Sequence, residues 1–215
     1  MATTTLELIT ITFKPSLKPD GDSPPSSFFS VCDQVRSVSG VAGIHHGSVL
    51  ERPTDWLVAV RWESSAALDD FIASPQRTAW LAAVRALADG YLVRRATLHG
   101  RLVDALSAPC TEVFYAFGTD DDFVDARLRP FADALAAERM TGHHASAWGP
   151  LDLVVCHGCE QPPTEGPAVV MLLGWDSKEA HLAHRGDDKT IDRHIHVVRE
   201  GRKSVEICHV NMTKS

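Results

Sequence analysis

Two short stretches, Val60-Arg-Trp-Glu-Ser64 and Leu173-Gly-Trp-Asp-Ser177, decide the interpretation of this chain. Each closes a predicted strand with a tryptophan, then gives an acidic residue and a serine, a residue type that begins helices. Both stretches occupy the same strand-to-helix junction in two successive series of elements. We therefore interpret the chain as a tandem repeat of one unit.

Hydrophobic periodicity outward from these junctions predicts the order strand, helix, strand, strand, helix, strand in each half. In the first half we expect strands at 6–13, 44–50, 56–62 and 91–99, and helices at 26–38 and 64–87, with a possible break at Pro75. In the second half we expect strands at 112–117, 144–148, 168–175 and 205–212, and helices at 120–140 and 176–199. The predicted domains are a first repeat at 1–100, a linker at 101–110 and a second repeat at 111–215.

A four-stranded sheet with helices on one face leaves its other face bare, and two such sheets can cover each other. The sequence therefore predicts an α+β fold in which tandem ferredoxin-like βαββαβ repeats form one intramolecular α+β barrel.

Composition excludes several classes of protein. The 215 residues carry a formal net charge of -7, and Lys and Arg do not cluster, so nucleic acid is not an expected partner. No apolar run reaches the roughly 18 residues of a membrane-spanning helix. We expect no membrane association and a hydrophobic small molecule as the partner of a monomer or homodimer.

The five cysteines are an odd number and argue against a disulfide framework, so we expect a reduced, cytoplasmic protein with free thiols. Cys156-His-Gly-Cys159 looks like half of a zinc site, but no second ligand pair accompanies it. The sequence also has no nucleotide-binding or phosphate-binding motif. We therefore expect no metal and no cofactor.

The stretch Trp62-Glu-Ser-Ser-Ala-Ala-Leu-Asp-Asp-Phe-Ile-Ala-Ser-Pro-Gln-Arg77 resembles the third-strand and second-helix region of dimeric α+β barrel proteins of the stress-responsive A/B barrel type. The stretches Trp175 to His181 and Glu206 to Val210 are similar to fungal members of the same superfamily, which includes the antibiotic-biosynthesis monooxygenase type. This resemblance implies the barrel fold. It also implies one of several activities, among them polyketide cyclases of the olivetolic acid cyclase type, cofactor-free monooxygenases, decarboxylases and haem enzymes.

The resemblance also locates the catalytic positions of the cyclases. Arg77 falls where those cyclases have a catalytic histidine, and Phe71 falls where they have a tyrosine. In the second half, Lys189 and His184 fall at these two positions. Arginine cannot act as a base near neutral pH, so neither half reproduces the cyclase residues.

Histidine is the richest chemical signal, with 11 residues. His181 and His184 lie three apart on a predicted helix and share a face, and His209 lies within an otherwise apolar strand. We predict His209, His184 and His181 as acid–base catalytic residues, with structural histidines as the alternative. For the pairs His45-His46 and His143-His144, we favour exposed positions at strand edges.

Apolar side chains alternate on equivalent strand faces of the two halves. The resemblance implies that this face meets the helices, where the cyclases have their ligand pocket. An arginine within such a pocket suits a carboxylate or enolate. Plain core packing is the alternative. The predicted substrate-binding residues are Trp56, Val58, Trp62, Phe71, Arg77, Trp80, Tyr115, His144, Met171 and Trp175.

We therefore expect a cofactor-independent enzyme of secondary metabolism, of the cyclase, dehydratase or lyase type, acting on a hydrophobic polyketide-like or terpenoid-like substrate. A first alternative is a cofactor-free monooxygenase of an anthrone or phenol. A second is a non-enzymatic, ligand-binding stress-response module that uses the same cavity.

Overall fold

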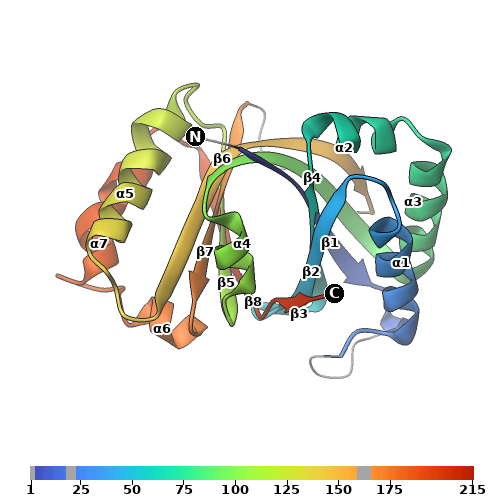
Figure 1. The fold of residues 1–215 in the computed structure, drawn as a ribbon. Helices are drawn as coiled ribbons and strands as arrows, with labels where there is room; N and C mark the ends of the chain where they lie inside the picture. The colour runs from blue at the N-terminus through green and yellow to red at the C-terminus, as the bar shows by residue number, and fades with distance from the viewer. Residues whose placement is uncertain (1–2, 18–22, 159–165) are drawn as a thin grey trace. The chain divides into compact units, whose positions relative to one another are not determined.

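The computed structural model describes residues 3–17, 23–158 and 166–215, and its elements are drawn in Figure 1. The chain divides into two compact units. The first unit is built mainly on Thr4–Arg95, and the second on Ala96–Asp152 and Pro163–Met212. The fold class is α+β, as the sequence predicts.

The first unit is an antiparallel sheet with its helices along one face (Figure 1). Strand β1 pairs with β3, β3 pairs with β2, and β4, whose residues up to Arg95 belong to this unit, lies beside β1. The elements are β1 (Thr4–Phe13), η1 (Pro15–Leu17), α1 (Ser26–Arg36), β2 (Val41–Val49), β3 (Arg52–Trp62), α2 (Ser65–Ile72), α3 (Pro75–Leu87) and β4 (Ala88–Gly100). A final short strand, β9 (Thr213–Lys214), pairs with β2.

The strands of the second unit have the same arrangement. Strand β5 pairs with β7 and with β8, and β7 pairs with β6, all antiparallel. The elements are α4 (Leu102–Ser107), β5 (Cys110–Phe117), η2 (Val124–Leu128), α5 (Arg129–Ala137), β6 (His143–His157), β7 (Ala168–Trp175), α6 (Lys178–Leu182), α7 (Thr190–His194), η3 (Ile195–Val198) and β8 (Ser204–Val210). In both units the strand order is second, third, first, fourth.

Strand register makes the two units equivalent residue by residue. Trp62 lies opposite Thr5 and Val60 opposite Glu7 in the first unit. Trp175 lies opposite Cys110 and Leu173 opposite Glu112 in the second, so Glu7 and Glu112 occupy the same position. After each tryptophan, the Ser64 or Ser177 hydroxyl accepts a hydrogen bond from the backbone N–H three residues later and caps α2 or α6. Origin by duplication stays a prediction from the sequence.

Several elements differ from their predicted bounds. The helix predicted at 64–87 is two helices, because Ser74 caps a new helix whose first residue is Pro75. Only Arg129–Ala137 of the segment 120–140 is α-helical, after the π-helical turn η2. The predicted linker contains the helix α4, and β6 is far longer than the 144–148 segment.

Two further sequence expectations concern membrane-spanning helices and the state of the cysteines. Among the residues in described positions, no helix is long and apolar enough to cross a membrane. Cys156 is disulfide-bonded, so the prediction of a free thiol is wrong there, and Cys159 lies outside the described residues. Cys32, Cys110 and Cys208 are buried and are not disulfide-bonded.

The expectation that His45 and His46 are exposed is wrong. Both are buried on β2, where the His46 ring packs edge-on against Phe28 with 5.1 Å between centroids. Burial lowers the pKa of His45 to about 4, and the nearby Arg61 and Lys214 act in the same direction. These rings are therefore held neutral because the charged form would lose its hydration.

The first testable prediction concerns pH and stability. The folded protein holds His45 neutral down to about pH 4, whereas an unfolded histidine takes up a proton near pH 6.5. Stability is therefore full above pH 6.5 and falls as the pH drops toward 4, by up to about 3 kcal/mol from this residue. Urea unfolding between pH 7 and pH 4 measures this loss. His45→Asn should flatten the curve, and an equally steep loss in that variant would contradict the assignment.

Candidate active site

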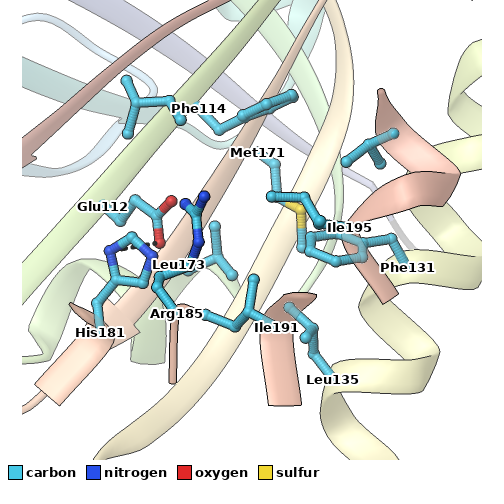
Figure 2. A pocket seen from close by; sticks show the side chains of 12 residues that line it. Glu112, Phe114, Phe131, Leu135, Met171, Leu173, His181, Arg185, Ile191 and Ile195 are labelled. Carbon is cyan, nitrogen blue, oxygen red and sulfur yellow. Dashed lines mark ion pairs between the residues drawn. The ribbon is translucent and has the colours of Figure 1, made fainter. Parts of the chain in front are cut away.

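A cavity lies in the second unit between the sheet and its helices (Figure 2). Its volume is about 30 Å³, enough for about one water molecule. Its wall is mostly apolar, and the polar exceptions are Glu112, His181 and Arg185. The apolar lining comes from β5, α5, β7, α7, η3 and β8 and includes Phe114, Phe131, Met171, Ile191 and Val198.

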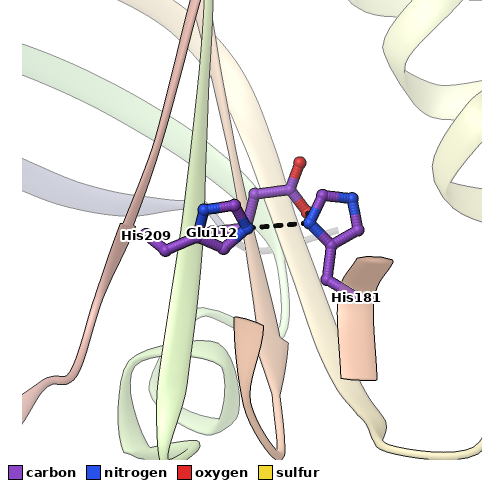
Figure 3. Close-up of side chains that lie close together, drawn as sticks. All are labelled: Glu112, His181 and His209. Atoms are coloured by element: carbon purple, nitrogen blue, oxygen red, sulfur yellow. Dashed lines mark hydrogen bonds and ion pairs between the residues drawn. The ribbon is translucent and has the colours of Figure 1, made fainter. Parts of the chain in front are cut away.

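Glu112, His181 and His209 form a buried cluster at this cavity, which we call the Glu–His–His cluster (Figure 3). His181 Nδ1 lies 2.7 Å from His209 Nε2, so the two rings share one hydrogen-bonded proton. The same Nδ1 lies 3.5 Å from Glu112 Oε2. Polar groups this deeply buried are costly unless they are paired, which the cluster achieves internally.

Each side chain of the cluster is positioned by a different element. Glu112 and His209 are direct cross-strand partners on β5 and β8, so their side chains emerge side by side on one face. His181 comes from α6, which begins at the capping residue Ser177. Strand register and a helix cap therefore bring together residues far apart in the sequence.

Trp175 supports the cluster without belonging to it. Its indole Nε1 donates a 3.0 Å hydrogen bond to Glu112 Oε2, and its ring stacks on His181 at 5.2 Å. The equivalent Trp62 stacks instead on Phe71, and among the described residues its indole N–H has no hydrogen-bond partner. The two tryptophans share a position and differ in their polar contacts.

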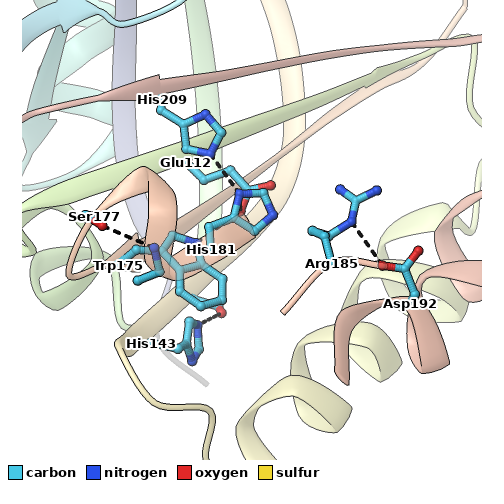
Figure 4. A network of polar contacts seen from close by, with 10 residues as sticks. Glu112, His143, Trp175, Ser177, His181, Arg185, Asp192 and His209 are labelled. Carbon is cyan, nitrogen blue, oxygen red and sulfur yellow. Dashed lines mark hydrogen bonds and ion pairs between the residues drawn. The ribbon is translucent and has the colours of Figure 1, made fainter. Parts of the chain in front are cut away.

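Arg185 belongs to a second polar group at the cavity (Figure 4). Its Nε donates to Asp192 Oδ2 at 3.2 Å, and the Gly186 N–H donates to the same oxygen at 2.8 Å. The Gly186 N–H, with smaller help from Arg185, lowers the pKa of Asp192. Asp192 therefore stays anionic and holds the guanidinium beside the cavity.

The structure brings together two of the three predicted catalytic residues. His181 and His209 meet in the cluster, whereas His184 is half-exposed, stacks on Trp175 at 6.0 Å and bonds through Nε2 to the Thr141 carbonyl oxygen. His184 matches Phe71 of the first unit, which stacks on Trp62. Its place is therefore explained by packing.

Predicted substrate-binding residues of the second unit fall in different places. Met171 lines the cavity, and Trp175 lies beside the cluster. Tyr115 lies on the other face of β5 from Glu112 and Phe114, because neighbouring strand residues alternate, and it stacks on Phe117. His144 is exposed, bonds to Asp176 and lines a separate groove of about 280 Å³.

The predicted residues of the first unit lie in a packed core. Trp56, Val58, Trp62, Phe71 and Trp80 belong to one buried apolar cluster. Arg77 forms a 2.7 Å ion pair with Glu7, and its guanidinium lies over the rings of Phe71 and Trp80. Burial raises the pKa of Glu7 against the opposing effect of Arg77.

Sequence reasoning missed Glu112 and Arg185, although both left a signal. Glu112 is the single acid in the apolar strand β5. Arg185 lies four residues after His181, a spacing that shares one face of the helix predicted at 176–199, although α6 itself ends at Leu182.

The second testable prediction compares the equivalent tryptophans. Both Trp175→Phe and Trp62→Phe trim a buried indole, but only the first removes a donor from a buried carboxylate. We expect Trp175→Phe to cost about 1.5–3 kcal/mol more in unfolding free energy than Trp62→Phe. Urea unfolding of both variants gives the difference, and equal losses would show that the hydrogen bond to Glu112 contributes nothing.

No protein-family model matches the chain, and no curated protein matches it. Among solved structures, an anthrone oxidase-like protein aligns with 98% of this chain and 93% of its own, at 16% identity and a TM-score of 0.64. A monooxygenase candidate from Fusobacterium nucleatum aligns with 100% of this chain and 94% of its own, at 11% identity and a TM-score of 0.63. One from Lactobacillus acidophilus aligns with 100% and 96%, at 11% identity and a TM-score of 0.60. At these identities the likeness shows the shared fold alone.

Proposed function

We propose that this chain is an enzyme that converts a hydrophobic small molecule in the cavity of the second unit, with the Glu–His–His cluster as its chemical centre. One observation carries the proposal: Glu112 and His181, two members of a buried polar cluster, lie on the wall of a mostly apolar cavity, and the third member, His209, is hydrogen-bonded to His181. Such groups are costly to bury and are concentrated at functional sites.

The lining indicates the kind of substrate. Aromatic and aliphatic side chains suit a hydrophobic ring system, and the His181 imidazole and Arg185 suit an oxygen that gains negative charge during reaction. A ketone that forms an enolate, or a phenol, fits this description. The cavity is smaller than such a molecule, so the proposal requires the wall to open for substrate entry.

Two reactions share this charged intermediate. Cyclisation or dehydration of a polyketide-like substrate is the reaction favoured from the sequence. Oxygenation of an anthrone or phenol is a comparable candidate, supported by the likeness in fold to the anthrone oxidase-like protein and the monooxygenase candidates. A pure binding module fits less well, because His181 and Arg185 lie at the cavity wall. A cytoplasmic location and a monomeric or homodimeric state stay predictions from the sequence.

The third testable prediction follows turnover. The purified protein is incubated with anthrones and with phenolic β-ketones while oxygen uptake and products are measured. We expect turnover to fall by about 100-fold or more in His209→Ala and to stay within about twofold in His184→Ala, which lies outside the cluster. Oxygen uptake equal to product formation selects the oxygenase, and product without uptake selects the cyclase or lyase. Unchanged turnover in His209→Ala, or no turnover of either substrate class, would overturn the proposal.

A further inference from the structure

We propose that Glu112, His181 and His209 form a binding site for one divalent transition-metal ion. The inference rests on the same cluster as the proposed function and names what the cluster holds. Two imidazole nitrogens and one carboxylate oxygen are a ligand set typical of iron, zinc, manganese and cobalt sites. The site departs from the expectation of no metal that the sequence alone suggests.

The donor atoms are already close enough for one ion to reach all three. They lie within 4.8 Å of one another, with 2.7 Å between the two nitrogens and 3.5 Å from His181 Nδ1 to Glu112 Oε2. Ligands bonded at about 2.0–2.2 Å to one ion lie about 3 Å apart. The ion would therefore replace the shared proton after the two rings separate by a few tenths of an ångström.

The ligands are held in place before any ion arrives. Glu112 and His209 are fixed by the β5–β8 register, and His181 by the capped helix α6. Trp175 donates to Glu112 Oε2 and stacks on the His181 ring, so it orients two of the three ligands (Figure 4). Outer partners of this kind orient metal ligands and raise affinity.

The fold itself does not require a histidine at position 181. His181 lies four residues after the capping Ser177, and the residue four after the equivalent Ser64 is Leu68, which is completely buried. The same scaffold therefore accepts leucine at this position in the first unit. An apolar residue would avoid the cost of burying an imidazole, which indicates that His181 is present for its chemistry.

The cavity beside the cluster suits a catalytic ion rather than a purely structural one. Three protein ligands leave at least one coordination position open, and catalytic metal sites keep such a position for water or substrate. The neighbouring space of about 30 Å³ holds about one water molecule. An ion there would polarise the substrate oxygen that the proposed function places at the cluster.

The fourth testable prediction is metal binding measured without substrate. The full chain, purified without a histidine tag and treated with a chelator, is titrated with Co²⁺ and Zn²⁺. We expect one equivalent of Co²⁺ to give visible bands of nitrogen and oxygen coordination, without the near-ultraviolet band of a cysteine ligand. Calorimetry with Zn²⁺ should give the same stoichiometry.

Three variants separate the ligands from the fold. His181→Leu copies Leu68 of the first unit and should still unfold cooperatively, with a lower melting temperature because His209 loses its ring partner. It should bind Co²⁺ at least about 100-fold more weakly. Glu112→Gln tests the carboxylate in the same way. His184→Ala, on the neighbouring helical turn, is the matched control and should bind like the parent chain.

The inference is overturned if the parent chain binds no stoichiometric Co²⁺ or Zn²⁺, or if His181→Leu binds as tightly as the parent. A cysteine charge-transfer band on the bound Co²⁺ would also overturn it. Failure here leaves the turnover test of the proposed function standing. Metal binding without turnover of any substrate would support this site while rejecting the enzyme proposal.

Discussion

The packing of side chains around the cluster in the second unit depends on the hydrogen bonding of one buried carboxylate. Glu112 lies within a strand whose other side chains are apolar or small, and its neighbours are arranged to meet it: the Trp175 indole, the His181 ring and the cross-strand His209. A buried carboxylate without donors would be strongly destabilising. The strand register, the start of α6 and the tryptophan at the end of β7 all serve this one requirement.

The first unit stabilises its buried carboxylate in a different way. Glu7 occupies the equivalent position, but Arg77 from α3 pairs with it directly, and Phe71 and Trp80 enclose the guanidinium. Both groups of this ion pair are buried within the core, so we interpret the pair as a structural contact. The second unit has histidine where the first has leucine, so its carboxylate is left facing groups that can exchange protons or ligands. Two units with the same strand order thus differ in chemistry through a few side chains.

Local sequence patterns predicted many of the strands and helices. Alternating β-branched residues located the strands, and the serine after each tryptophan located two helix starts. The lengths of β6 and α5 were not evident, because the sequence of β6 does not alternate regularly and η2 interrupts the helical pattern. Within the site, His209 was recognisable as a polar residue in an apolar strand. Its contact with His181 was not, because a pairing of residues 28 apart depends on how the helix packs on the sheet.

The two stacked tryptophans allow the state of the cluster to be followed by fluorescence, with one indole as an internal reference for the other. Trp62 and Trp175 occupy the same backbone position, but one ring lies on a phenyl group and the other on an imidazole. A phenyl ring is chemically inert, whereas an imidazole quenches a neighbouring indole differently according to what its nitrogens hold. Replacing the other three tryptophans would leave a pair of fluorophores in which only Trp175 reports the state of the cluster, while Trp62 records everything that affects both units alike.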